Sequence, residues 1–223
     1  LNAKSKNVIT LEDPVEYQME NVNQIQVNRK AGVDFAAGLK SILRQDPDII
    51  MVGEMRDEET AAIAVKAAMT GHLVLSTLHT NDAPGAYDRL KDMNIAPYLL
   101  ASSIIGVIAQ RLVRVICKHC KIEDQVEPEI LQQIGINPDD GVKLYKGAGC
   151  AKCSDTGYRG RTGLYEILAP TPEVKKLIFA GELVEGTVVP GLERMIDHGR
   201  SKVIEGVTSI DEVCRVVRMN EVF

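Results

Sequence analysis

Three short apolar runs constrain the fold of this chain more than any other feature. They lie in the strands expected at Val8 to Leu11, Asp48 to Val52 and Leu73 to Leu75, and segments with helical periodicity lie between them. Strands that alternate with helices predict an α/β unit whose sheet is mostly parallel. Because the runs are continuously apolar, we expect buried strands in a sheet that is covered on both faces.

The other elements of the first 112 residues follow from weaker patterns. Val22 to Val27 alternates apolar and polar residues, as an exposed edge strand does. Asp57 is a plausible N-cap for a helix that should be buried, because its residues are apolar nearly all round. Helices are expected at 34–44, at 58–69, from Asn81 onward, and once or twice between Pro97 and Val113.

Polar side chains follow each of the three apolar runs. They are Glu12 and Asp13, then Glu54, then Thr77, His79 and Thr80. Ligands of open α/β sheets bind beyond the carboxyl ends of the strands. Taken alone, a strand-end Glu is usually solvated and a single His is more often a structural donor. Converging carboxylates, hydroxyls and an imidazole instead suit a magnesium-bound phosphate and an attacking water.

Four of the five cysteines form two C-x2-C pairs with 29 residues between them, namely Cys117, Cys120, Cys150 and Cys153. Two such pairs can present four thiolates tetrahedrally, as structural zinc requires. The separation is long for a compact zinc ribbon, but a helical insert around Pro128 to Ile136 can absorb it. The alternative is four free thiols in a module held by its own packing. We expect His119 to face solvent and Cys214 to be an ordinary buried thiol.

Charge and hydropathy exclude some classes of protein. The net charge is −5, and the region from Arg111 to Arg161 holds nine basic and seven acidic residues. This balance gives little of the counterion release that drives nucleic-acid binding. The longest near-apolar run, Tyr98 to Ala109, is shorter than the roughly 20 residues of a membrane span. We therefore expect a soluble, intracellular chain with reduced thiols.

Several segments together resemble one family. "ITLEDPVEY" resembles the aspartate box of the secretion and type IV pilus ATPases, and "LRQDPDIIMVGEMRDEET" resembles their Walker B segment. "TGHLVLSTLHTND" is similar to their histidine box, and the cysteine pairs are similar to their tetracysteine motif. The resemblance covers essentially all 223 residues. It implies a RecA-like P-loop NTPase core, of which this chain holds part, within a hexameric ATPase.

The resemblance also implies roles for the strand-end residues. Glu54 would coordinate magnesium and water, Glu12 is the candidate general base, and His79 would contact the γ-phosphate region. The residues expected to bind nucleotide or magnesium are Asp13, Arg44, Arg56 and Thr77. The two arginines would stabilise charge, or alternatively form surface or interface salt bridges.

One motif of such ATPases is missing from this sequence. No G-x-x-x-x-G-K-[ST] occurs, and "GYRGRTG" at Gly157 to Gly163 has the glycines but not the Lys-Ser/Thr ending. In this fold the phosphate loop precedes the aspartate-box strand. We therefore expect a C-terminal fragment that, without the backbone amides and Lys of that loop, binds ATP poorly and hydrolyses little alone.

Changes in composition and hydrophobic periodicity along the chain predict three domains. A partial RecA-like core would cover residues 1–114, a tetracysteine zinc module 115–164, and a C-terminal helical subdomain 165–223. In the last of these, Thr171-Pro172 predicts a helix start, and Ser209 to Glu212 predicts a capping box that opens the final helix.

The resemblance predicts a cytoplasmic motor, peripheral at the inner membrane, that couples ATP hydrolysis to type II protein secretion or type IV pilus assembly. It would be a homohexamer that contacts an inner-membrane platform protein and cytoplasmic assembly components, with ATP, magnesium and structural zinc as cofactors. The cysteine pairs favour the secretion and pilus-extension branches over the retraction branch. The alternatives are a non-catalytic zinc-containing docking piece and, more distantly, a zinc-ribbon nucleic-acid binder.

Overall fold

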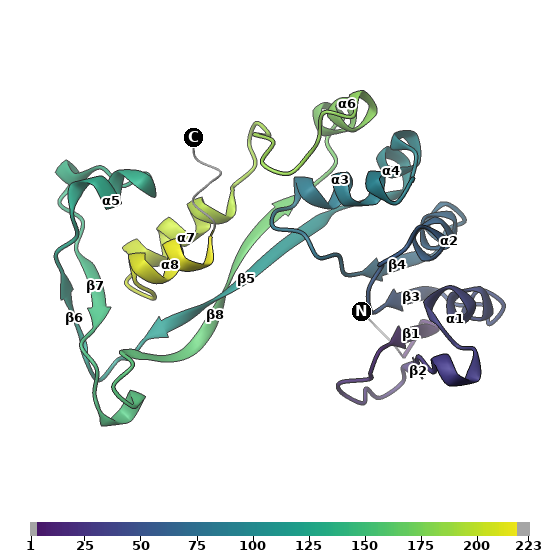
Figure 1. Ribbon diagram of the computed structural model, residues 1–223, viewed down its shortest axis with the longest axis horizontal. Coiled ribbons are helices and arrows are strands. Elements are labelled where there is room, and N and C mark those ends of the chain that lie inside the picture. Colours follow the sequence, from purple (N-terminus) through teal and green to yellow (C-terminus); the bar gives the residue numbers. More distant parts are fainter. Residues whose placement is uncertain (1–3, 218–223) are drawn as a thin grey trace. The chain divides into compact units, whose positions relative to one another are not determined.

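The computed structural model describes residues 4–217, which form two compact units. Within the described residues, unit 1 consists of 4–107 and 169–187, and unit 2 consists of 108–168 and 188–217. Figure 1 labels the elements of both units. None of the helices in residues 4–217 is long and apolar enough to cross a bilayer.

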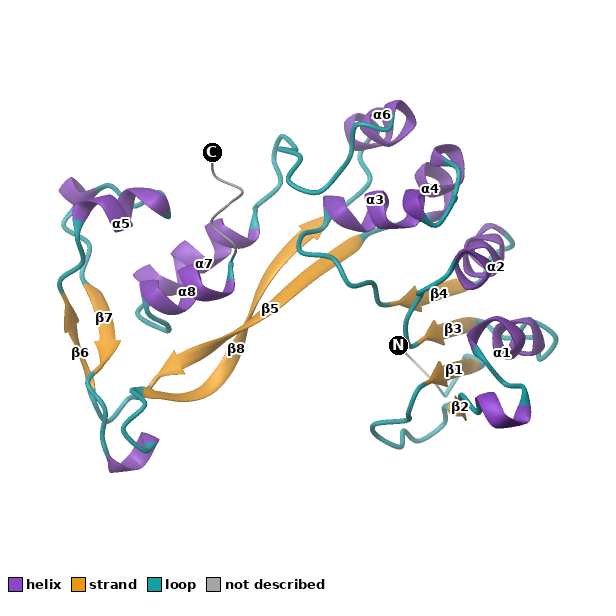
Figure 2. Cartoon of the chain, viewed as in Figure 1, coloured by secondary structure: helices purple, strands orange, loops and turns teal. Residues whose placement is uncertain are grey.

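Unit 1 is built on a four-stranded sheet with the strand order β2-β1-β3-β4, and every pair of neighbours is parallel (Figure 2). The strands are β1 (Val8–Glu12), β2 (Asn23–Gln26), β3 (Ile49–Val52) and β4 (Leu73–Ser76). The prediction of a parallel α/β unit is confirmed, and so is the position of β2 at an edge.

Two helices cover one face of this sheet, α1 (Phe35–Ile42) and α2 (Glu58–Met69). Each begins after an aspartate whose side chain accepts a hydrogen bond from the first turn: Asp34 from the Ala37 amide and Asp57 from the Thr60 amide, both at 2.8 Å. The core between sheet and helices is aliphatic, apart from Phe35, and includes Ile9, Leu11, Leu39, Ile42, Ile50, Val52 and Ala64.

The opposite face of the sheet is more polar. β1 is buried along its whole length, as expected, but Thr10 and Glu12 point away from the apolar core. The expectation of a buried β4 is wrong, because Leu75 is 39% exposed and the rest of the strand is half-buried. The continuous apolar run therefore identified the strand correctly, but it did not predict how much of the strand is buried by other elements.

Three more helices complete unit 1: α3 (Pro84–Asp92), α4 (Pro97–Ser103) and α6 (Pro172–Ala180). The expected helix start at Thr171 is confirmed, since its hydroxyl accepts from the Val174 amide. The Asp82 carboxylate accepts from the amides of Gly85 and Gly186, both at 2.7 Å. Asp82 thus ties the later segment to the first part of unit 1.

Unit 2 contains two small sheets. β5 (Val107–Ile116) pairs with β8 (Tyr158–Leu168), and β6 (Lys121–Asp124) is antiparallel to β7 (Leu144–Gly147). Its helices are α5 (Pro128–Gln133), α7 (Met195–Ile204) and α8 (Ile210–Val216). The expected helical insert is confirmed by α5.

Two expectations are corrected here. The segment from Pro97 to Val113 holds one of the one or two expected helices, α4, but the chain is extended from Val107. The chain does not turn helical at Tyr165, because β8 continues to Leu168. The domain boundaries expected after residues 114 and 164 therefore fall inside β5 and β8.

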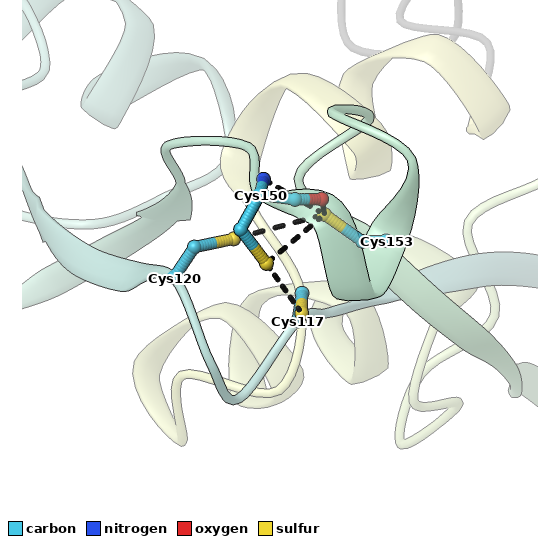
Figure 3. Close-up of side chains that lie close together, drawn as sticks. All are labelled: Cys117, Cys120, Cys150 and Cys153. Carbon is cyan, nitrogen blue, oxygen red and sulfur yellow. Dashed lines mark hydrogen bonds between the residues drawn. The ribbon is translucent and has the colours of Figure 1, made fainter.

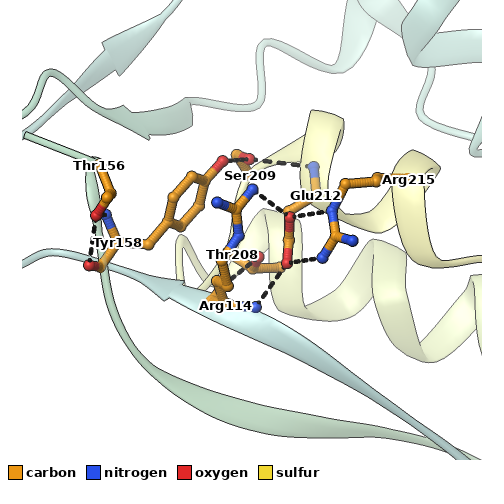
Figure 4. Close-up of polar contacts among 7 residues, drawn as sticks. All are labelled: Arg114, Thr156, Tyr158, Thr208, Ser209, Glu212 and Arg215. Carbon is orange, nitrogen blue, oxygen red and sulfur yellow. Dashed lines mark hydrogen bonds and ion pairs between the residues drawn. The ribbon is translucent and has the colours of Figure 1, made fainter.

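A buried carboxylate joins α8 to β5 (Figure 4). The Glu212 side chain is 0% exposed and accepts from the Arg114 backbone N–H at 2.9 Å and Nη2 at 2.7 Å, and from Arg215 Nε at 2.8 Å and Nη2 at 2.7 Å. Burial works to raise the pKa of Glu212, but the two arginines outweigh it and lower the pKa to about 2. Ser209 caps α8 as predicted, yet the Glu212 carboxylate serves Arg114 and Arg215.

Candidate active site and metal centre

The three strand ends of unit 1 lie side by side. The strand register pairs Leu11 with Val52 and Val52 with Ser76, so the next residue on each strand lies at the same level. Backbone hydrogen bonds extend the pairing past the strands, from Gly53 N to Leu11 O at 2.8 Å and from Met55 N to Thr77 O at 3.1 Å. Glu12, Glu54 and Thr77 are therefore held at one edge of the sheet.

Glu54 is the most strongly paired carboxylate of this edge. Its Oε2 lies 2.6 Å from Arg56 Nε and 3.4 Å from His79 Nε2, and its side chain is 13% exposed. The hydrogen bond from Arg56, with a smaller effect of His79, holds the pKa of Glu54 below its usual range. His79 is 85% exposed, so its ring faces solvent beside this carboxylate.

Glu12 is buried at the end of the adjacent strand. Its Oε1 accepts from Thr10 Oγ1 at 2.6 Å and from Gln24 Nε2 at 2.9 Å. A Cβ at position 53 would lie 3.2 Å from the Leu11 carbonyl and 3.5 Å from the Glu12 Cα. Gly53 thus lets the two strands approach closely just before Glu54.

Two arginines interact with Asp13, the other acidic residue expected at this edge. Asp13 lies 3.7 Å from Arg29 Nη2. The pKa of Arg56 is raised chiefly by its hydrogen bond to Glu54, with a smaller contribution from Asp13. Arg29 and Arg56 line a pocket of about 390 Å³ together with the starts of α1 and α2, which add the acidic Asp34, Asp57 and Glu59. Sequence reasoning missed Arg29, because it lies in a short 3-10 helix (Arg29–Ala31) that belongs to no motif.

The structure does not bring Arg44 to this edge. Its guanidinium donates to the Lys40 carbonyl at 3.0 Å and to Ser41 Oγ at 3.3 Å, just past the end of α1. The chain enters β3 soon afterwards, so Arg44 lies near the edge where strands begin. The Thr77 hydroxyl donates to the Gly53 carbonyl at 2.7 Å, so Thr77 also braces the turn before Glu54.

These groups fit a magnesium-bound phosphate. The edge offers carboxylate oxygens, which magnesium prefers, beside an imidazole and two guanidiniums that complement an anion. The lowered pKa makes Glu54 a weak proton acceptor, which suits metal or water coordination better than general-base catalysis. Glu12 has no cationic partner among the described residues, and its carboxylate is the better placed proton acceptor.

The four paired cysteines of unit 2 converge on one point, as Figure 3 shows. All four sulfur atoms lie within 4.8 Å of one another. The Cys117–Cys150 sulfur separation is 4.0 Å, and those of Cys120–Cys153 and Cys150–Cys153 are 3.8 Å. A tetrahedral zinc with bonds of about 2.3 Å requires sulfur atoms about 3.8 Å apart. The thiols therefore fit zinc.

The chemistry of the thiols agrees with this geometry. Without a metal, burial together with hydrogen bonds that the Cys120 thiol donates to the other sulfurs raises the pKa of Cys120 to about 12. For Cys153, the effect of burial is outweighed by the amides of Cys150 and Gly157, and its pKa falls to about 7. A divalent cation would let all four sulfurs ionise together. His119 is exposed, as predicted, whereas Cys214 is only half-buried.

Comparison with known proteins identifies the family. A family model described as "Type II/IV secretion system protein" matches residues 1–215. The chain belongs to this family. It is 49% identical over 222 residues to the type II secretion system protein E of Pseudomonas aeruginosa, a match that covers 98% of this chain and 44% of that protein. It is 48% identical over 214 residues to the type IV pilus assembly ATPase PilB of Thermus thermophilus, covering 93% and 24% respectively.

Solved structures of this kind share the fold. A crystal structure of the pilus retraction motor PilT with bound ADP matches with a TM-score of 0.68 and 29% identity, covering 94% of this chain and 52% of that one. The ATPase DotB of Legionella pneumophila, at 22% identity and a TM-score of 0.62, shows likeness of fold alone. The chain thus shares its α/β fold with the ATPases PilT and DotB, and the family expected from the sequence is confirmed. The chain spans less than half the length of the curated relatives named above.

Proposed function

We propose that the protein containing this chain is a RecA-like ATPase motor that couples ATP hydrolysis to type II protein secretion or type IV pilus assembly. The observation that carries the proposal is the shared strand edge of unit 1, where Glu12, Glu54 and Thr77 end adjacent parallel strands. Family membership and the bound ADP named for PilT support a nucleotide at this edge.

Each group at this edge has a proposed role. Glu12 would accept a proton from the attacking water, and Glu54 would orient that water and hold magnesium. His79 and Arg56 would stabilise the charge of the γ-phosphate, while Asp13 and Thr77 would support the nucleotide and its metal. ATP with magnesium, when bound, supplies the electrophilic phosphorus. We assign no part in this site to Arg44, whose guanidinium is bonded to its own helix.

The wider assembly is proposed from the relatives. We infer a homohexamer, cytoplasmic and peripheral at the inner membrane, that contacts an integral platform protein and cytoplasmic assembly components and binds no nucleic acid. The four-cysteine cluster is proposed to hold structural zinc. Identities of 46–49% to secretion proteins E and to PilB support the secretion and pilus-extension branches over retraction.

Replacing the two strand-end glutamates in the full-length protein tests this proposal. Glu12→Gln should lower the rate of ATP hydrolysis by about 100-fold or more, because general-base catalysis contributes roughly 10²–10⁴-fold. Glu54→Gln should also lower this rate, because it removes the charge of the carboxylate proposed to hold magnesium. Equilibrium binding of a fluorescent ATP analogue should persist in Glu12→Gln. Glu20→Gln, an exposed change in the loop after β1, is the control and should hydrolyse ATP normally. Full activity in both site variants would overturn the proposal.

A further inference from the structure

The side-chain amide of Gln24 links Glu12 to the loop that follows it. Gln24 Nε2 donates to Glu12 Oε1 and to the Tyr17 carbonyl, both at 2.9 Å. Gln24 Oε1 accepts from the Met19 backbone N–H at 2.7 Å. A backbone N–H can only donate and a carbonyl can only accept, so these partners fix which end of the amide faces the carboxylate.

The register of the sheet creates this contact. Thr10 pairs with Gln24 across β1 and β2, and Glu12 pairs with Gln26. Side chains two residues apart on a strand share a face, so Thr10, Glu12 and Gln24 meet on the face away from the apolar core. The same residues on a register shifted by one would point into that core.

Both donors reach the same oxygen of Glu12. Thr10 Oγ1 and Gln24 Nε2 occupy Oε1, and within residues 4–217 no side chain or backbone donor reaches Oε2. The carboxylate is therefore held in one orientation with one oxygen available. A general base needs such an orientation, because a misplacement of about 1 Å can cost roughly 100-fold in rate.

We propose that Gln24 is a positioning residue, which holds Glu12 so that Oε2 faces the attacking water. The inference rests on the proposed function, since it requires Glu12 to act as the base. It also couples catalysis to the loop, because the same amide binds the backbone at Tyr17 and Met19. A displacement of the backbone at Tyr17 or Met19 would thereby turn the carboxylate of Glu12.

Two substitutions at Gln24 separate positioning from simple loop support. Gln24→Glu keeps an acceptor for the Met19 amide but places a carboxylate against Glu12, whereas Gln24→Leu removes both contacts. In the full-length protein, we expect both variants to lower kcat for ATP hydrolysis by about 10-fold or more and to leave KM for ATP within about twofold. Gln110→Leu, the same change at an exposed position of β5 in unit 2, is the matched control and should keep normal kcat.

The outcomes distinguish this inference from the proposed function. Normal kcat in Gln24→Glu, with a defect in Gln24→Leu, would show loop support only and overturn positioning. A defect in KM alone would overturn it as well. If Glu12→Gln is inactive while both Gln24 variants are normal, this inference fails and the proposed function stands. In the expected case, adding Gln24→Leu to Glu12→Gln causes no further loss of kcat.

Discussion

Individual side chains at the strand edge differ in how far the sequence could reveal them. Glu12, Glu54, His79 and Thr77 were expected there because each follows an apolar run, and the structure places all four at that edge. Gln24 and Thr10 were missed. Both are polar residues within strands, and only the pairing of β1 with β2 shows that they meet Glu12. Arg44 was expected at the site from its motif, but it bonds to its own helix instead.

Glu212 should carry a large share of the stability of unit 2. Glu212→Gln removes a buried charge that serves two arginines, and removing one partner of a buried ion pair typically costs about 3–5 kcal/mol. Arg114 and Arg215 are 44% and 58% exposed and can rehydrate, so we expect the lower end, about 3 kcal/mol. Urea unfolding at neutral pH measures this loss.

The pH dependence of that loss has a defined sign. The folded-state pKa of Glu212, about 2, lies below its ordinary value of 4.5, so its stabilisation is complete above 4.5 and is lost as the pH falls toward 2. The gap between wild type and Glu212→Gln should therefore narrow with acidification. Glu205→Gln removes an exposed pair with Lys202 and should cost less than about 1 kcal/mol. Equal losses in the two variants would contradict this account.

Among the helices and strands, the helix starts that depend on a capping residue were predicted most accurately. Asp57, Thr171 and Ser209 were recognised as helix starts because a cap depends only on neighbouring residues. The start of β5 was not recognised as a strand, because Ile108 and Leu112 are apolar yet exposed, which hides the alternation of buried Ala109 and Val113. Because apolar residues lie on both faces of this strand, the sequence does not show the alternation of buried and exposed side chains.

The end of β7 depends on two glycines in contact. A Cβ at Gly147 would lie 1.9 Å from the Gly157 carbonyl oxygen, which accepts the Cys117 amide. Gly147→Ala must therefore displace backbone beside the cysteine cluster. We expect a loss of unfolding free energy of about 2 kcal/mol or more and weaker zinc binding by competition with a chelator.

Gly160→Ala is the matched comparison for that prediction. Gly160 has a φ of +83° but nothing lies within 4 Å of its would-be Cβ, so only backbone strain of about 1–2 kcal/mol opposes the change. Zinc affinity in this variant should be normal. If Gly160→Ala releases zinc as readily as Gly147→Ala, the contact between Gly147 and Gly157 is not what holds the cluster.

For the molecule as a whole, each of the two compact units is built from separate stretches of the sequence, which a division into contiguous domains does not describe. Residues 169–187 belong to unit 1, although 108–168 before them and 188–217 after them belong to unit 2. Composition shows where periodicity and residue types change along the chain. It does not reveal that Asp82 binds Gly186 or that Asn81 binds Glu185 at 2.6 Å. Such pairings between distant segments have no local signature.

Metal removal should affect the two units unequally. All four cysteines of the cluster lie in unit 2, so a chelator should increase hydrogen exchange of amides in β6, β7 and residues 148–157. Amides of β1 and β3 should exchange at unchanged rates. Mass spectrometry of intact protein should find one zinc per chain before treatment and none after. A protein purified under reducing, chelator-free conditions without zinc would refute the metal assignment.

The pairing of Arg114 with Glu212 also sets an order of events during synthesis. The four strands of unit 1 are complete once Ser76 has left the ribosome, and the last cysteine of the cluster follows at Cys153. Arg114, however, must wait for Glu212, which is made 98 residues later. Because domains fold as units while the chain emerges, β5 stays without its buried partner until translation reaches α8. A nascent chain halted before Ser209 would thus contain all four cysteines of the cluster in a unit 2 that still lacks α8.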